Sequence, residues 1–391
     1  MFNFFKTLQQ RTPLGLLQLQ HDPWRLLTAI AGITFADVLI FMQLGFADAL
    51  YTSNTQYPRA LQADIVLLST QAKNFNLLRS FPRRRLYQAQ DVPGVVSADA
   101  LYIGTVQWRN PETRKKTAMM VVGQNPDQPA FALPEVNRQL AATRLPNHVL
   151  FDQVSRGDYS AMIERVNQGG VATTDIADRT VTVAGLFKVG ASFAYDGALI
   201  TSDQNFLRFF PKSHPGAVNL GLVRLAPEAN AAQVKNALKQ RLPDDVQVLT
   251  GQEYVDFELN EIQKNSPIGF VFGVGTAMGL IVGVVIVYQV LSTDVNSHLA
   301  EYATFKAMGY RNRYLLGVIF EEALLLSLFG FVPGLLISLG AYAVTASAAA
   351  LAISMPLERV LQVFVLTLLM CSASGGIATR RLQAADPADI F

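Results

Sequence analysis

The sequence is poor in cysteine, histidine and charge. Cys371 is the one cysteine among 391 residues, so the chain cannot form an internal disulfide or a cysteine-rich metal site. The four histidines (His21, His148, His214, His298) show no metal-type spacing, and we predict no metal site. Charged residues make up 16% of the chain and the net charge is +2, which argues against a nucleic-acid-binding surface.

The motifs of common enzymes are also missing. The sequence contains no G-x-x-x-x-G-K-[ST] phosphate loop, no G-x-S-x-G elbow and no H-E-x-x-H helix. We therefore predict no catalytic residue and no cofactor in this chain, which cannot bind ATP by the usual phosphate loop.

Long apolar runs, in contrast, are abundant. Half of the residues are hydrophobic, and they gather near the N-terminus and in the last third of the chain. A helix needs roughly 20 apolar residues to cross a bilayer. We predict four transmembrane helices, at residues 26–49, 268–292, 314–345 and 358–379.

Lysine and arginine beside these spans indicate their orientation, because short cytoplasmic segments are enriched in them. They occur before the first span, between the second and third, and in the tail (Lys6, Arg11, Arg25, Lys306, Arg311, Arg313, Arg380, Arg381). All three segments fall on one side. We predict a multi-pass protein of the cell inner (plasma) membrane with both termini cytoplasmic, including the tail at 380–391, and with segments 50–267 and 346–357 periplasmic.

Residues 1–25 form an amphipathic N-terminal segment, with apolar residues at helical spacing and little charge. We predict a helix that lies on the cytoplasmic face of the membrane. A helix that only packs against the protein is the alternative.

Segment 50–267 is typical of a mixed α/β domain. Strand-like runs recur at 64–68, 100–108, 117–122, 179–187, 198–201, 218–225 and 246–249, with a helical stretch at 229–242. Asn110-Pro111-Glu112 separates two of the runs as a hairpin turn. The predicted fold class is therefore an α-helical membrane protein with four transmembrane helices and a mixed α/β periplasmic domain between the first two. A helix at 252–264 would link motion of this domain to the second span.

The second span carries glycines at a spacing of four, Gly275, Gly279 and Gly283. Small residues on one stripe let two membrane helices approach closely. The stripe predicts either packing within the subunit or a dimer contact.

Three acidic residues fall within predicted spans. Asp37 is near the middle of the first span, where a charge is costly, so we expect a hydrogen bond to Gln289 or Tyr288, with a functional role as the alternative. Glu321 and Glu322 lie about two turns into the third span, and we expect them to be solvated near the interface.

The cytoplasmic loop at 293–313 is the most informative segment. The pattern predicts a short amphipathic helix from Ser297 to Met308, capped by Asn296 or Ser297 and ended by Gly309. Its apolar side chains exceed what a connector needs, which favours burial by a partner protein; a helix lying on lipid is the alternative.

The same loop resembles a known family. The run Glu301-Tyr-Ala-Thr-Phe-Lys306-Ala-Met-Gly309-Tyr310, followed by Glu322-Ala-Leu-Leu-Leu-Ser327 and Gly330, resembles the FtsX-like permease domain of the MacB/LolCDE superfamily. The runs that begin at Phe35, Val284 and His298 are similar to DevC, the membrane subunit of cyanobacterial DevBCA-type exporters.

The resemblance implies the permease subunit of an ABC-type exporter with a MacB-like periplasmic domain. Its partners would be a separate DevA-like ATPase that binds the ATP, a DevB-like periplasmic adaptor, indirectly a TolC-like outer-membrane channel, and a second copy of the permease. The substrate would be a glycolipid or another amphiphile. The ATPase would dock on the coupling helix through Ser297, Glu301, Tyr302, Phe305, Lys306, Met308, Gly309 and Arg311.

Three other functions remain open at this point. A related permease could release lipoproteins from the membrane, or an FtsX-like protein could regulate periplasmic cell-wall hydrolases. The size of segment 50–267 favours the MacB plan over FtsX, which has a small outer domain. A transporter driven by protons through Asp37 and Glu322 is less compatible with four spans and no inverted repeat.

Overall fold

The computed structural model describes residues 22–176, 179–265, 267–298, 301, 304, 308, 312–349 and 353–384. The chain divides into two compact units. The helical unit comprises residues 1–47, 270–344 and 353–391, and the sheet unit comprises residues 48–269 with 345–352. The amphipathic helix predicted at 1–25 lies outside the described residues except for its last four.

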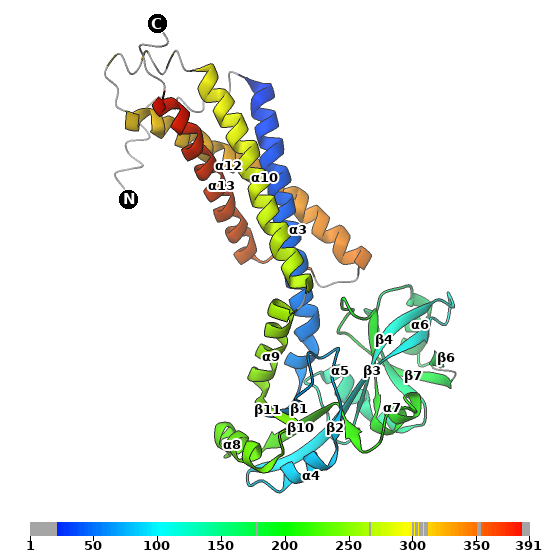
Figure 1. The fold of residues 1–391 in the computed structure, drawn as a ribbon. Helices are drawn as coiled ribbons and strands as arrows, with labels where there is room; N and C mark the ends of the chain where they lie inside the picture. Colours follow the sequence, from blue (N-terminus) through cyan, green and yellow to red (C-terminus); the bar gives the residue numbers. More distant parts are fainter. Residues whose placement is uncertain are drawn as a thin grey trace. The chain divides into compact units, whose positions relative to one another are not determined.

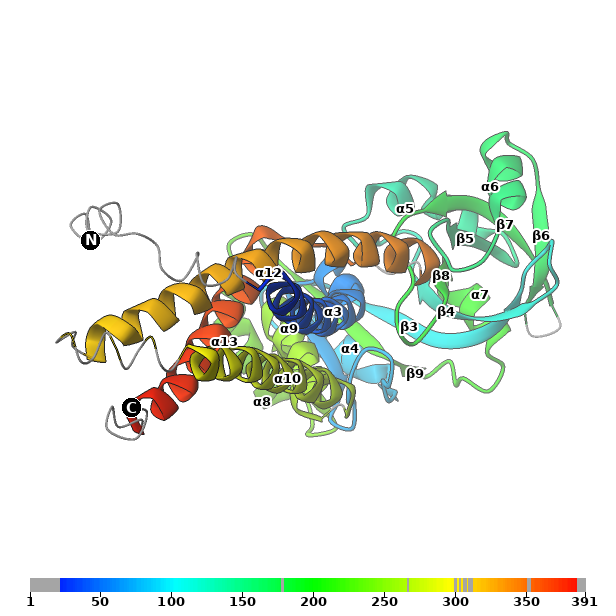
Figure 2. The same ribbon diagram turned by 90° about the horizontal axis from the view of Figure 1, so that it is seen from above.

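Four helices in the described part of the chain are long and apolar enough to cross a membrane (Figures 1 and 2). They are α3 (Pro23–Ala60), α10 (Pro267–Ser297), α12 (Asn312–Ala349) and α13 (Leu357–Ala384). The predicted fold class, four apolar helices with a mixed α/β domain between the first two, is confirmed. The boundaries of the spans within the bilayer stay predictions.

The first helix, α3, is much longer than a bilayer requires. Its 38 residues extend for about 57 Å at 1.5 Å per residue, against roughly 30 Å of hydrocarbon. The division between the two units falls inside α3, between residues 47 and 48. One continuous helix therefore belongs to both units.

The sheet unit is built on one mixed sheet. In its described part, nine strands follow the order β11-β1-β10-β3-β4-β8-β5-β7-β6, and a separate pair joins β2 to β9. Among the described strands, only the pairs β4–β8 and β5–β7 are parallel. The strands are β1 (Ile65–Ser69), β2 (Phe81–Pro82), β3 (Val95–Arg109), β4 (Lys116–Gln124), β5 (His148–Asp152), β6 (Ala172–Ile176), β7 (Arg179–Phe187), β8 (Gly197–Ser202), β9 (Ala217–Val218), β10 (Leu220–Leu225) and β11 (Val246–Thr250).

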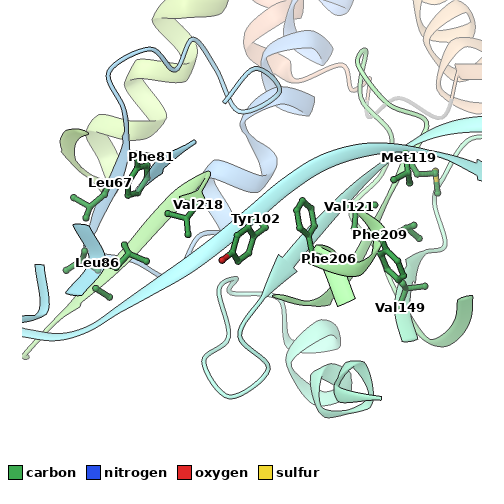
Figure 3. Close-up of a cluster of buried hydrophobic side chains, with 14 of the residues drawn as sticks. Leu67, Phe81, Leu86, Tyr102, Met119, Val121, Val149, Phe206, Phe209 and Val218 are labelled. Carbon is green, nitrogen blue, oxygen red and sulfur yellow. The ribbon is translucent and has the colours of Figure 1, made fainter. Parts of the chain in front are cut away.

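Helices and their side chains cover both faces of this sheet. The described helices of the unit are α4 (Arg84–Gln90), α5 (Pro134–Gln139) with the 3-10 turn Leu140–Arg144, α6 (Ser160–Asn167), α7 (Asp203–Phe209), α8 (Ala231–Arg241) and α9 (Gly251–Asn260). Along β4, Met119 and Val121 point into one core, and Met120 and Val122 into the other. The first core also contains Tyr102 and Phe206, which stack with 5.4 Å between ring centroids (Figure 3).

Several strands predicted from the sequence are present in the structure. The predicted strand at 179–187 coincides with β7, those at 117–122 and 198–201 lie in β4 and β8, and the one at 64–68 overlaps β1 except for its first residue. The predicted turn after β3 is confirmed: the side-chain oxygen of Asn110 accepts hydrogen bonds from the backbone N–H groups of Glu112 and Thr113 at 2.8 and 3.0 Å. The run at 218–225 is divided into β9 and β10, and β5 and β6 were not predicted.

The last helix of the sheet unit begins with a capping box. The Thr250 hydroxyl accepts a hydrogen bond from the Glu253 N–H, and the Glu253 carboxylate accepts one from the Thr250 N–H. A π-helical turn (Glu261–Asn265) follows α9, and α10 begins at Pro267. The helix predicted at 252–264 is therefore α9 plus this turn.

A buried glutamate lies on α9. The Glu258 side chain is fully buried, and one carboxylate oxygen accepts a hydrogen bond from the Phe75 N–H at 2.9 Å. Burial raises the pKa of Glu258 to about 7, although the Phe75 hydrogen bond acts in the opposite direction. Glu258 is therefore protonated at pH 5 in the folded protein and increasingly ionised above pH 7.

We expect Glu258→Gln to flatten the pH dependence of stability. An unfolded glutamate ionises near pH 4.3, so the stability that protonated Glu258 contributes is lost as pH rises through about 7. Glutamine does not titrate, so between pH 5 and pH 8 the variant should lose less stability than the wild type, by about 1–3 kcal/mol. Thermal unfolding of the purified full chain in detergent measures this difference. Asp256→Asn, at an exposed position of the same helix, is the control, and parallel pH profiles for Glu258→Gln and wild type would contradict the expectation.

Candidate functional site

Helix α3 contacts each of the three other long helices described in the helical unit. It runs antiparallel to α10, so that Arg25 lies beside Asp294 and Ile40 lies beside Gly279. It runs parallel to α12, where the Thr34 hydroxyl donates to the Gly330 carbonyl at 3.1 Å and the Tyr342 hydroxyl donates to the Phe41 carbonyl. Asp37 joins it to α13. α3 is therefore the central helix of this unit.

The glycine stripe of the second span faces helices of the same chain. A Cβ atom at Gly275 would meet the Gln43 side chain, one at Gly279 would lie 3.0 Å from Ile40, and one at Gly283 would meet Met370 and Ala36. The residues therefore pack against α3 and α13. Gly273, on the same helix, has no atom within 4 Å of such a Cβ. The predicted dimer contact of the stripe is untested and stays a prediction.

Asp37 is buried, and its partner is not the predicted one. Its Oδ1 accepts a hydrogen bond from the Thr367 hydroxyl of α13 at 2.6 Å, whereas we expected Gln289 or Tyr288 of α10. The reason is the rotation of α3, which turns Asp37 toward α13 and toward Gly334 of α12. Oδ2 has no hydrogen-bond partner among the described residues.

Charged and polar side chains gather where α3 begins and α10 ends. Arg25 Nη1 lies 3.0 Å from Asp294 Oδ1, and Nη2 donates to the Ser297 hydroxyl at 3.2 Å. Glu322 of α12 is 1% exposed, and it interacts electrostatically with both Asp294 and Arg25. The expectation that Glu322 is solvated was wrong, whereas Glu321 is partly exposed.

Helix α10 extends beyond the end predicted for the second span, into the predicted coupling segment. α10 continues through Ser297, which is its last residue and not the cap of a new helix. No glycine or proline interrupts this stretch, and the Thr293 and Ser297 hydroxyls donate to carbonyls four residues earlier. Glu301 is exposed and Met308 is 61% exposed. The other predicted docking residues lie outside the described side chains: Tyr302, Phe305, Lys306, Gly309 and Arg311.

Across the described residues, no group of three or more histidine, cysteine, aspartate or glutamate side chains is placed to hold a metal ion. Cys371 is buried in the helical unit. Sequence reasoning missed Arg25 and Asp294 as a pair. The available signal was an aspartate at the end of an apolar span and an arginine just before another, both on the predicted cytoplasmic side.

Comparison with known proteins identifies the class of the last three helices. Residues 273–387 match the family model described as FtsX-like permease C-terminal. This part of the chain, from α10 to α13, therefore resembles an FtsX-like permease domain, and it includes three of the described helices that are long and apolar enough to cross a membrane. No match was found among curated proteins.

Two solved structures resemble parts of the chain at low similarity. The periplasmic region of MacB from Actinobacillus actinomycetemcomitans shares 8% identity, with 50% of this chain and 92% of that chain covered and a TM-score of 0.34. The extracellular domain of the ABC-type transporter YknZ from Gram-positive bacteria shares 13% identity, with 48% and 99% covered and a TM-score of 0.30.

The contact between α12 and α3 predicts that replacing a glycine of α12 with alanine changes stability at some positions and not at others. At Gly334, a Cβ atom would lie 2.9 Å from the Asp37 Cβ, which a side-chain rotation cannot relieve. Gly334→Ala should therefore destabilise the helical unit by about 1–3 kcal/mol. Gly340→Ala, at a position of the same helix with nothing within 4 Å, should be neutral or slightly stabilising.

Thermal unfolding in detergent and the yield of monodisperse protein measure both changes. Equal loss for Gly334→Ala and Gly340→Ala would contradict the close approach of α12 to α3.

Proposed function

We propose that this protein is the permease subunit of an ABC-type exporter. The observation that carries the proposal is the FtsX-like permease domain at 273–387, which contains the segment after α10. Within it, Glu301 and Met308 follow the end of α10 and are both exposed. An exposed methionine in this segment suits a protein partner better than bulk water. The partner in this proposal is a DevA-like ATPase.

The geometry of the helical unit suits transmission of force. A push on the segment after α10 moves α10, and the antiparallel packing of α10 on α3 carries the movement to α3. α3 continues into the sheet unit, and α10 is joined to the sheet unit through the π-helical turn and α9. Both covalent connections would then carry the ATP-driven motion to the sheet unit.

The proposed assembly follows from the predicted topology. The sheet unit lies in the periplasm, where it engages a DevB-like adaptor and, through it, a TolC-like channel. Two copies of the permease form a homodimer, and the ATPase subunits bind to its cytoplasmic side and close on each other when they bind ATP. The exported substrate is a glycolipid or another amphiphile, as in DevC-type exporters, and both termini of the permease are cytoplasmic.

A lipoprotein-releasing permease is the second candidate, because the same topology and coupling segment would serve it. An FtsX-like regulator of cell-wall hydrolases is disfavoured by the size of the sheet unit, which spans residues 48–269. Export from cells and release of lipoprotein from membranes are separate assays, so the two permease functions are distinguishable.

Co-purification tests the ATPase partnership. We expect an ABC ATPase subunit encoded by the same genome to co-purify with the tagged wild-type permease. The double variant Glu301→Arg, Met308→Asp should reduce recovery of the ATPase at least about tenfold, because it reverses one exposed charge and places another on the apolar contact. Glu358→Arg reverses an exposed charge at the start of α13 and should leave recovery unchanged.

Failure of every candidate ATPase to bind the wild type would overturn the proposal. Retention of the ATPase by the double variant would show that Glu301 and Met308 are not part of the interface with the ATPase.

A substitution of Asp37, the buried acid in the first span, distinguishes the proposed ATP-driven permease from a proton-driven transporter. Asn at position 37 keeps an oxygen that accepts the Thr367 hydrogen bond but cannot exchange a proton. For an ATP-driven permease, Asp37→Asn should keep transport within about twofold of wild type at equal protein level. Loss of transport with normal folding and normal ATPase binding would bring the proton-coupled alternative forward.

A further inference from the structure

We propose that Arg25 is a positioning residue that fixes the end of α10, and with it the start of the coupling segment that follows Ser297, to α3. The start of α3 and the end of α10 would then move as one body. The inference rests on the proposed function, in that the segment after Ser297 is taken as the contact for the ATPase. It goes further because it assigns a role to Arg25, a side chain of α3 that is not part of the predicted docking surface.

The guanidinium of Arg25 holds the last turn of α10 at two points. Nη1 lies 3.0 Å from Asp294 Oδ1, and Nη2 donates to the Ser297 hydroxyl at 3.2 Å. Asp294 and Ser297 are three residues apart and so lie on one face of the helix. The rigid planar fork of arginine fits two acceptors at once, which a lysine ammonium on a flexible stem does not do equally well.

The arginine is also required by the charges around it. Asp294 lies in the last turn of α10, where the helix dipole disfavours a negative charge. Glu322 of α12 is buried beside it, and each of these two acids has one carboxylate oxygen without a hydrogen-bond partner among the described residues. Without Arg25, the buried charge of Asp294 would lose the cation that lies 3.0 Å from it.

A line of contacts leads from this pair to the exposed docking residues. His298 Nε2 lies 3.9 Å from Asp294 Oδ1, and His298 Nδ1 lies 3.1 Å from Glu301 Oε1. Asp22 adds an exposed contact at 3.5 Å to Arg25 Nε. The path Arg25, Asp294, His298, Glu301 therefore connects the start of α3 to the start of the coupling segment.

Limited trypsin digestion of the purified permease tests the inference without an ATPase. Lys306 and Arg311 are trypsin sites in the coupling segment. Arg25→Gln should accelerate cleavage there about tenfold while cleavage in the sheet unit stays at the wild-type rate, because the charged hydrogen bonds that hold the last turn of α10 are lost. Asp22→Asn removes the charge of the exposed contact but keeps an oxygen for the hydrogen bond from the Arg25 backbone N–H, so it should leave the rate unchanged.

Charge reversal distinguishes pairing from a general defect. Cleavage is scored at Lys306 and Arg311, because Asp294→Arg adds a trypsin site of its own. Arg25→Asp and Asp294→Arg alone should each accelerate this cleavage, and the double variant should restore it toward the wild-type rate. If Arg25→Gln does not accumulate in the membrane, Ser297→Ala replaces it, since it removes one of the two contacts and should accelerate cleavage about threefold. Unchanged cleavage in Arg25→Gln, or in Ser297→Ala where it stands in, overturns the inference, as does a double variant no better than the single ones.

A second measurement separates this inference from the proposed function. With an ATPase bound, Arg25→Gln should lower the permease-dependent stimulation of ATP hydrolysis about tenfold, while the hydrolysis rate of the isolated ATPase is unaffected. If no ATPase binds the wild type, the proposed function fails and the digestion result alone decides the role of Arg25. If the ATPase binds and stimulation persists in Arg25→Gln, the role of Arg25 fails and the proposed function stands.

Discussion

The close packing of α3 against three helices is the constraint on which the helical unit depends. Lipid supplies no hydrophobic drive for helix association, so close van der Waals contact and polar contacts must hold the helices together. Glycines at 279, 283, 330 and 334 remove side chains where α3 passes its neighbours. Asp37 and Arg25 add hydrogen bonds at two further levels of the same helix. Sliding of any helix along α3 would break several of these contacts, so motion of the unit as a rigid body is favoured.

Hydropathy alone was sufficient for the architecture, because the requirement for about 20 apolar residues is independent of how helices are arranged. In the sheet unit, strands buried on both faces appear in the sequence as nearly continuous apolar runs, which made β1, β4 and β8 visible. β6, with the sequence Ala-Thr-Thr-Asp-Ile, has no such run. β5 is short and has polar residues at both ends. Such strands form because neighbouring strands pair with them, which a local pattern does not record.

The partners of the buried polar residues were beyond sequence reasoning for a different reason. Residue spacing places Asp37 at a depth in the bilayer but does not fix the rotation of α3, and its partner Thr367 is 330 residues away in the chain. The glycine stripe indicated close approach without naming the helix that approaches. Glu322 was considered separately from Arg25 and Asp294, although the fold gathers all three. In all three cases, sequence reasoning therefore missed interactions between segments that are distant in the sequence.

The first and last strands of the sheet unit pair with each other. β1 follows α3 and β11 precedes α9, and the two are joined over five residue pairs from Ile65–Thr250 to Ser69–Val246. The two ends of the inserted segment therefore lie side by side, which is the condition under which one domain can interrupt another without disturbing it. In evolutionary terms, the inserted segment is therefore a domain that can be exchanged as a whole. Recombination could replace it with a unit of another size, while the four described membrane-capable helices keep their own packing.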